Sequence, residues 1–431
     1  MAIFSLCALA AVLTQTQGSV YARLFPIPSG TNGYEEYVQA VDVLKDSHWV
    51  AYEQWRSYLA SRSKPSPPSQ SMASEESEPD RPEGVSLDMT DLQVRRVQDQ
   101  RYGSALHWLK QGNLKPVVSP YSNITFATIF PEMAGFKLIA KADANHAYLE
   151  FADGRSDLAV KDLLEGLKFS QKICTTTRIG CLVSIACQSI ILAEFNLHLS
   201  QLSESDAMDI DRATKQLIAQ PVPMSQLLRE EARASVSVLD EVVDHPESFL
   251  DDMEGRKDKT KPYNLSPDDK AKLKSLILSG IDNRLNEEIK RYEGPETGWV
   301  IRDRSPDPIP GTNDRSVSGL ALQFVNFLMG KETKIGFATA VAKARIQLRL
   351  LRLHAQVIEY KWQNGFLPKK LSEFARDGAG FDPIVNAPFH YEPKNGAYTL
   401  YSEGTPETGR IELKYKRTAP ATSDSNDPGP P

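Results

Sequence analysis

The feature that most constrains this chain is a long helical pattern near its C-terminus, between Ile335 and Gly365. Apolar side chains recur there at alternating spacings of four and three, which aligns them along one continuous helix face. That face contains Phe337, Val341, Ala344, Leu348, Leu351, Ala355, Ile358 and Trp362. A second apolar series runs from Ile346 to Tyr360 on a neighbouring face. We therefore expect a central helix with apolar partners on two sides.

The segment that follows this helix, up to Gly404, predicts a small α+β module. Asn364-Gly365 ends the helix, and Asp382-Pro383 makes a turn. The short runs FHY and YTLYS then predict an antiparallel hairpin. We expect the hairpin to pack on one face of the long helix, and a helical bundle formed by residues 87–334 to pack on the other.

Composition indicates a soluble globular chain. Of its 431 residues, 41% are hydrophobic and 25% are charged, which are ordinary values for such proteins. The formal net charge of -6 gives no general attraction to nucleic acid or to anionic membranes. We therefore expect no nucleic-acid partner.

The N-terminal residues have the features of a secretory leader. No residue before Arg23 is charged, the run from Ala2 to Leu13 is largely apolar, and Val20 and Ala22 suit a cut after Ala22. The run is too short to cross a bilayer, which takes about 20 residues. We predict a periplasmic or secreted protein, either cut after Ala22 or anchored by an uncleaved leader, with no other membrane span.

The rest of the chain predicts a mainly α fold, a bundle of antiparallel hairpins. Residues 23–60 predict N-terminal helices, and residues 61–86, rich in Ser, Pro and Glu, predict a disordered linker. The N-terminal helices are therefore expected to be tethered to the helical domain of residues 87–334. An α+β module over residues 335–417 and a disordered tail over residues 418–431 complete the chain.

Two segments resemble known families. Ala147, Phe151, Gly154, Ala159 and Leu163 fall where one tetratricopeptide repeat has small, aromatic, turn, small and large residues. A repeat array needs several stacked units, and no second unit follows. We therefore favour a generic helical hairpin over a repeat array.

The C-terminal segment resembles the globular part of type II secretion major pseudopilins. The matching positions are Gly365, Pro368, Leu371, Asp382-Pro383, Pro388, Tyr391, Tyr398, Leu400, Tyr401, Ser402 and Gly404. The resemblance implies a long helix covered by a hairpin. It does not extend to the methylated leader and membrane-spanning half of that family, nor to its calcium ligands, since Glu407 is the one acidic residue close behind Gly404.

The order of parts as a whole resembles a group of secreted helical proteins of planctomycete- and armatimonad-type bacteria. The shared features are an NGY-type N-terminal helix, a long helical middle and the LP…DP…Y…LYS ending. This resemblance implies a compartment and carries no activity.

The sequence has no recognisable catalytic motif: no nucleophile elbow, P-loop, HExxH or glycine-rich turn after a strand. Its densest polar cluster is Glu241, Asp244 and His245, with Glu230 and Glu231 a few turns earlier. These residue types could serve as an acid/base pair or a metal site. A solvated helix end is the favoured interpretation, so we assign no catalytic, cofactor-binding or metal-binding residue.

Acidic loops and cysteines give no stronger signal. Asp251, Asp252, Asp268 and Asp269 lack the alternating ligand pattern of a calcium loop. Cys174, Cys181 and Cys187 have no CxxC spacing, and the latter two lie in an apolar run that predicts buried helix positions. Whether any two of the three form a disulfide stays open, and we expect no cofactor.

Three functional hypotheses follow. The first is a non-enzymatic envelope scaffold that holds a partner outside the cytoplasm. The second is a hydrolase-type enzyme using Glu241, Asp244 and His245, which requires those side chains to lie at a cleft. The third is a degenerate component of a secretion system, related to pseudopilins.

Overall fold

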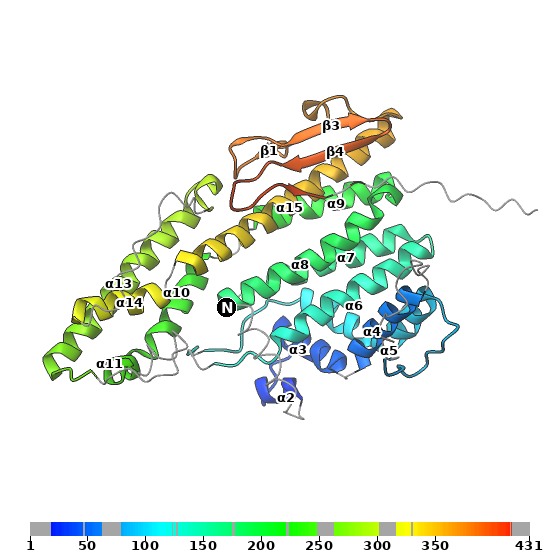
Figure 1. Cartoon of the computed structure of the whole chain (residues 1–431). Coiled ribbons are helices and arrows are strands. Elements are labelled where there is room, and N and C mark those ends of the chain that lie inside the picture. Colours follow the sequence, from blue (N-terminus) through cyan, green and yellow to red (C-terminus); the bar gives the residue numbers. More distant parts are fainter. Residues whose placement is uncertain are drawn as a thin grey trace, which may run out of the picture.

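The computed structural model describes residues 19–45, 48–62, 79–122, 124–125, 128–174, 177–220, 224–247, 263–300, 316–328, 331–413 and 415. The chain is mainly helical, with a small C-terminal module of antiparallel strands, as the sequence predicted (Figure 1). Residues 1–18 of the predicted leader, most of the predicted linker and the predicted tail lie outside the described residues. The last residues of the predicted leader are described: Val20, Tyr21 and Ala22 begin the short helix α2 (Val20–Leu24), and Val20 is fully buried.

The helices of the first half are α2 (Val20–Leu24), α3 (Gly33–Leu44), α4 (His48–Arg62), α5 (Asp91–Asn113), α6 (Met133–Ala152), α7 (Ser156–Lys172), α8 (Arg178–His198) and α9 (Glu204–Ala219). Those of the second half are α10 (Met224–Val236), α11 (Leu239–Asp244), α13 (Pro267–Glu293), α14 (Val317–Leu328) and α15 (Lys331–Asn364). Short 3-10 turns are η1 (Leu199–Gln201), η2 (Glu296–Gly298) and η3 (Leu371–Glu373).

Local capping explains where several helices begin. The Asn32 side chain accepts a hydrogen bond from the backbone N–H of Tyr34 at the start of α3. Ser203 and Asp206 form a reciprocal capping box at the start of α9. Ser266 caps α13, and Pro267 occupies its first turn, where the missing N–H costs nothing.

The N-terminal helices are not merely tethered to the bundle, so that expectation was wrong. Helix α3 packs against α5 and α6 in the main core. Its Tyr34 hydroxyl donates to Glu132 Oε1 at 2.6 Å, and its Tyr37 hydroxyl donates to Asn113 Oδ1 at 2.7 Å. The Ser- and Pro-rich composition of residues 61–86 does not predict this packing. Helices on either side of such a segment can pack against each other whether the segment is ordered or not.

Helix α15 has partners on two sides, as predicted. One side packs on α9 and α8, and the other contacts β4 and β5 of the strand module (Figure 1). On the bundle side Arg352 donates from Nε to Asp211 Oδ1 at 2.9 Å. On the module side His354 is fully buried against Tyr398. Trp362 departs from the predicted inward face: 59% of it is exposed, although its indole N–H donates to the Leu202 carbonyl.

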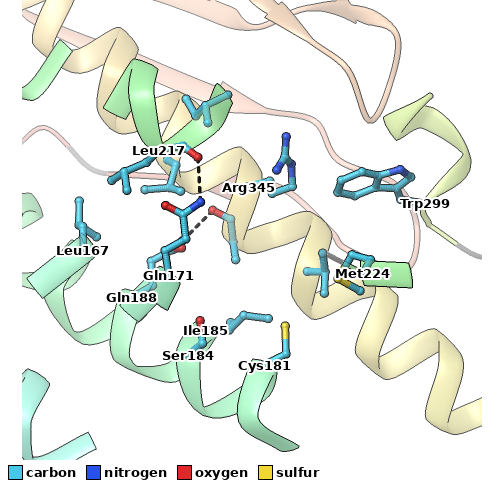
Figure 2. A pocket seen from close by; sticks show the side chains of 14 residues that line it. Leu167, Gln171, Cys181, Ser184, Ile185, Gln188, Leu217, Met224, Trp299 and Arg345 are labelled. Carbon is cyan, nitrogen blue, oxygen red and sulfur yellow. Dashed lines mark hydrogen bonds between the residues drawn. The ribbon is translucent and has the colours of Figure 1, made fainter. Parts of the chain in front are cut away.

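The helices between residues 87 and 334 do not share one core. A second cluster of buried apolar side chains joins α10, α11, α13, α14 and the first turns of α15, and lies to the left in Figure 1. Helices α10 and α11 are separated by a break at Ser237-Val238. A buried ion pair between Arg178 and Glu288, at 2.8 Å, connects α8 to this second core. A small cavity lies where the two clusters meet (Figure 2).

The C-terminal module holds two small antiparallel sheets. Strand β1 (Phe381–Asp382) pairs with β2 (Ala387–Pro388), and β3 (His390–Lys394), β4 (Ala397–Ser402) and β5 (Ile411–Glu412) pair in that order. The β3–β4 hairpin turns at Asn395 and Gly396, whose φ values of 51° and 75° fit a two-residue hairpin turn. Tyr398 and Leu400 alternate inward toward α15, while Thr399 faces out. The predicted hairpin is therefore present and covers the long helix.

Candidate functional site

The polar cluster singled out in the sequence does not form a site. Glu241, Asp244 and His245 are all exposed at the end of α11. Asp244 accepts a hydrogen bond from Lys270 Nζ at 2.8 Å, and that ion pair lowers the pKa of its carboxyl. None of the three lines the cavity between the two cores or the groove along α7. Neither of these spaces therefore provides the cleft that the hydrolase hypothesis requires at these residues.

The other residues considered from the sequence have structural positions. Asp268 and Asp269 lie in the first turn of α13, where Asp269 bonds its cap Ser266, and Asp251 and Asp252 lie outside the described residues. Cys174, Cys181 and Cys187 are buried and unbridged. Burial raises the pKa of the Cys187 thiol to about 12, which keeps it protonated and unreactive at neutral pH.

The structure brings together a different polar cluster, centred on His146 of α6. Its Nδ1 lies 3.1 Å from both carboxylate oxygens of Asp99 on α5. Its Nε2 lies 3.4 Å from Asp162 of α7 and 3.8 Å from Glu150. The hydrogen bond with Asp99 is the main reason why the pKa of His146 is raised. An open groove of about 810 Å³ borders this cluster along α7.

Two of the three carboxylates around His146 also have a Lys or Arg partner, whereas Asp99 is paired with His146 itself. Lys110 Nζ lies 2.6 Å from Asp162, and Arg155 Nη2 donates to Glu150 at 3.1 Å. No Ser, Thr or Cys lines the groove among the described residues, so a hydroxyl or thiol nucleophile is missing there. No group of three or more His, Cys, Asp or Glu side chains in the described part of the chain could hold a metal ion. The cluster therefore acts as an ion-pair network that joins α5, α6 and α7.

Asp143 lies beneath this network and is fully buried. Neither of its carboxylate oxygens has a hydrogen-bond partner among the described residues. Burial raises its pKa well above the ordinary value, and the nearby charge of Asp162 adds to the effect. A side chain on Gly166 would reach within 2.2 Å of its Oδ2, so the glycine makes room for the carboxyl group. A buried protonated acid without partners is a source of instability in the bundle.

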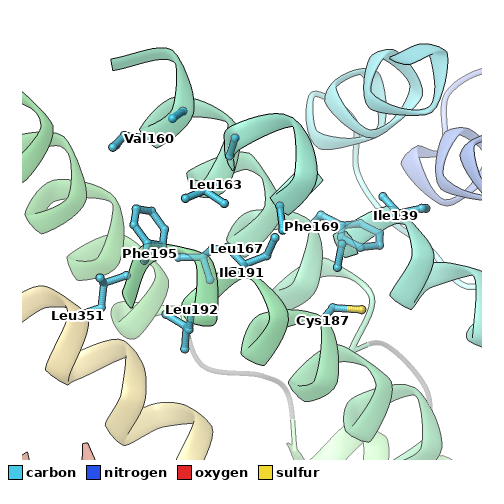
Figure 3. Close-up of a cluster of buried hydrophobic side chains, with 14 of the residues drawn as sticks. Ile139, Val160, Leu163, Leu167, Phe169, Cys187, Ile191, Leu192, Phe195 and Leu351 are labelled. Atoms are coloured by element: carbon cyan, nitrogen blue, oxygen red, sulfur yellow. The ribbon is translucent and has the colours of Figure 1, made fainter. Parts of the chain in front are cut away.

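The strongest surface feature is the solvent-facing side of α8. Its other sides pack against α6, α7 and α15, and Figure 3 shows Phe195 and Ile191 of α8 directed toward Leu163 and Leu167 of α7. The outward side, called the α8 face below, consists of Ile179, Leu182, Ala186, Ser189, Ala193 and Leu197. These positions follow helical spacing along about 27 Å of helix.

The α8 face is apolar and has no charge. Ile179, Leu182 and Leu197 are 48%, 42% and 50% exposed. The charged or titratable residues of the helix, Arg178, Glu194 and His198, are all buried. Helix α8 and the η1 turn that follows it form the one helical segment in the described part of the chain that is long and apolar enough to span a bilayer. The inward side of α8 lies in the main core of the bundle.

Sequence reasoning missed the α8 face because it attributed the apolarity of residues 178–199 entirely to burial. One signal could have revealed it. A helix that buries one side against a bundle normally carries charges on the opposite side, and none of the outward positions of α8 does so.

Comparison with known proteins adds no constraint: no protein-family model, no curated protein and no solved structure matches this chain. The function must therefore be argued from the molecule's own surface and cavities.

Proposed function

We propose that this chain is a non-enzymatic scaffold that works outside the cytoplasm and docks a protein partner on the α8 face. One observation carries the proposal: Ile179, Leu182 and Leu197 stand exposed in a line that no charge interrupts. Full burial of one such side chain is worth about 1.5–3 kcal/mol. Contiguous exposed apolar surface of this kind marks interaction sites on soluble proteins.

The shape of the α8 face favours a helix as the docking element. Small residues, Ala186, Ser189 and Ala193, occupy its middle, and larger aliphatic residues stand toward both ends. A partner helix can approach closely over the small residues and place its own apolar side chains between the larger ones. The partner segment is therefore an amphipathic helix whose contacting side is uncharged, since a charge buried there would find no counter-charge.

The compartment rests on the leader, whose charge-free apolar run and cut position after Ala22 support export. The pseudopilin-like alternative is weaker, because α8 and α9 cover the side of α15 opposite the hairpin. That helix side is therefore not free to pack against neighbouring subunits of a filament.

Site-specific photocrosslinking in the cells that make the protein tests the proposal. A benzophenone amino acid replaces Leu182, and a matched chain carries it at Leu322, which is 43% exposed. Leu322 belongs to α14, a helix that packs in the second core. We expect irradiation of the Leu182 chain to give one discrete heavier species containing a second protein. We expect none from the Leu322 chain. Adding Leu197→Asp to the Leu182 chain should abolish the adduct.

Three outcomes contradict the proposal. They are no adduct at Leu182, equal adducts at both positions, and an adduct consisting of two copies of this chain. The third would mean that the α8 face serves self-association instead of a distinct partner.

A further inference from the structure

The cavity between the two cores has an apolar wall. It has a volume of about 60 Å³ and lies among α7, α8, α9, α10, α15 and Trp299, which follows η2 (Figure 2). Leu217, Met224, Val341 and Leu348 supply much of its lining. One water needs about 10–15 Å³ of such space, so the cavity has room for about four to six water-sized groups. A short alkyl chain or a small ring has this size.

The uncharged polar residues of the cavity wall already use their donors in the fold. Gln171 Nε2 donates to the Leu217 carbonyl at 3.1 Å, and Gln188 Nε2 donates to the Ala344 carbonyl at 2.7 Å (Figure 2). Ser184 Oγ donates to the Ser170 carbonyl at 2.6 Å. These residues hold α7, α8, α9 and α15 together, so they do not need a ligand.

Arg345 is the one charged residue that lines the cavity among the described residues. Its guanidinium lies 4.9 Å from the centre of the Trp299 ring. It donates from Nε and Nη2 to Glu296, at 3.0 and 2.5 Å, and neither bond uses Nη1. The indole and the ion pair therefore fix the position of the cation at the cavity wall.

The charges around Arg345 do not balance. Arg349 Nη2 donates to both carboxylate oxygens of the same Glu296, at 3.1 Å each. The Arg349 Nε is buried without a hydrogen-bond partner among the described residues. The three side chains are 13–20% exposed. Among the described residues, these two largely buried guanidinium groups thus share one carboxylate, which leaves a surplus positive charge beside an apolar cavity.

We propose that this cavity binds a small amphipathic carboxylate, a short acyl or aryl acid. Its apolar tail fills the space between the two cores, and its carboxylate pairs with Arg345 to balance the surplus charge. This site is independent of partner docking on the α8 face, and either proposal can fail without the other.

Isothermal titration calorimetry of the full chain with straight-chain carboxylates tests the site. From propanoate to hexanoate we expect affinity to rise about fourfold with each added CH₂, and to stop rising once the tail exceeds the cavity. Hexan-1-ol and hexylammonium serve as matched probes without the negative charge. Both should bind at least about tenfold more weakly than hexanoate.

Variants separate the tail from the charge. Arg345→Gln should weaken hexanoate binding about tenfold or more and leave hexan-1-ol binding unchanged. Lys343→Gln, which removes a charge from the same helix away from the cavity, should change neither. Ala344→Leu should fill the cavity and abolish binding of hexanoate and of hexan-1-ol. Ile218→Phe fills it from α9 and replaces Ala344→Leu if that variant fails to fold, as judged by circular dichroism.

The proposal is overturned if hexanoate does not bind. It is equally overturned if hexanoate binds no better than hexan-1-ol, or if binding survives both Arg345→Gln and a folded cavity-filling variant.

Discussion

Acidification should loosen the strand module from α15, because a buried neutral histidine holds the two together. His354 lies fully buried on α15. Its Nε2 is 2.9 Å from the Leu413 carbonyl and its Nδ1 is 2.8 Å from the Tyr398 hydroxyl. A carbonyl can only accept, so Nε2 carries the hydrogen, and Nδ1 accepts from the tyrosine. A second proton on the ring would stop Nδ1 from accepting this bond and would place a positive charge in the buried interface.

The size of the effect follows from the pKa. Burial lowers the pKa of His354 from its ordinary 6.5 to about 4. Above pH 6.5 the ring is neutral in both the folded and the unfolded chain. As pH falls from 6.5 toward 4, the unfolded chain takes up the proton and the folded chain does not, so the free energy of unfolding decreases. One pKa unit corresponds to about 1.4 kcal/mol, so about 2 kcal/mol is lost by about pH 5.

Hydrogen exchange measured by mass spectrometry gives the local opening free energy of β4 at about pH 7.5 and about pH 5. Other groups also titrate in this interval, so the wild type is compared with His354→Gln, whose side chain does not titrate. We expect the wild type to lose about 2 kcal/mol more than the variant over this interval. Amides of α13 in the second core provide an internal control and should show no such difference.

An equal loss in wild type and variant would refute this reasoning. A titration of the His354 ring by NMR with a midpoint near 6.5 would do the same, because it would mean that the ring accepts the proton without leaving the interface.

Two further predictions concern the packing of the bundle. A Cβ on Gly112 would lie 2.3 Å from the Tyr37 ring, whereas a Cβ on Gly103 of the same helix would meet nothing within 4 Å. Gly112→Ala should therefore lower the free energy of unfolding, measured in urea, by about 1–3 kcal/mol. Gly103→Ala should raise this free energy by about 0.5–1 kcal/mol. Equal effects of the two substitutions would show that α3 and α5 are not in close contact. The raised pKa of Asp143 means that the folded chain keeps a proton which the unfolded chain releases above pH 3.8, so stability falls as pH rises. Asp143→Asn removes this dependence, and its melting temperature relative to wild type should increase as pH rises above 3.8. A constant difference would contradict a raised pKa of Asp143.

Much of the fold could be predicted because its signals are local. The caps at Asn32, Ser203 and Ser266 act on backbone N–H groups within three residues. The two apolar faces of α15 are visible in one stretch of sequence, and so is the Asn395-Gly396 hairpin turn. Each of these features reports its structure without knowledge of the rest of the chain.

What could not be predicted depends on how distant helices cross. Asp99, His146 and Asp162 come from three helices, and only the packing of α5, α6 and α7 brings them together. The docking of α3 into the main core is of the same kind. The break between α10 and α11 falls in the run SVSV, which has no Gly or Pro to mark it.

The candidate docking surface was missed for a different reason. Apolar residues on every side of α8 predict burial on every side, and only the neighbouring helices decide which side stays exposed. The residues considered as catalytic show the opposite case, in which closeness in sequence does not produce a site. Glu241, Asp244 and His245 are close in sequence, yet all three are exposed and none lines the cavity between the two cores or the groove along α7.

The most direct test of the docking surface is the dissociation constant of the crosslinked partner, once purified, for two matched variants. Leu182→Asp places a charge at one of the larger aliphatic residues of the α8 face, and Leu322→Asp places one at an equally exposed position of α14. We predict that Leu182→Asp weakens binding about thirtyfold or more, as expected for an apolar contact worth about 2 kcal/mol, while Leu322→Asp binds like the wild type. Wild-type affinity in a folded Leu182→Asp variant would contradict docking on the α8 face.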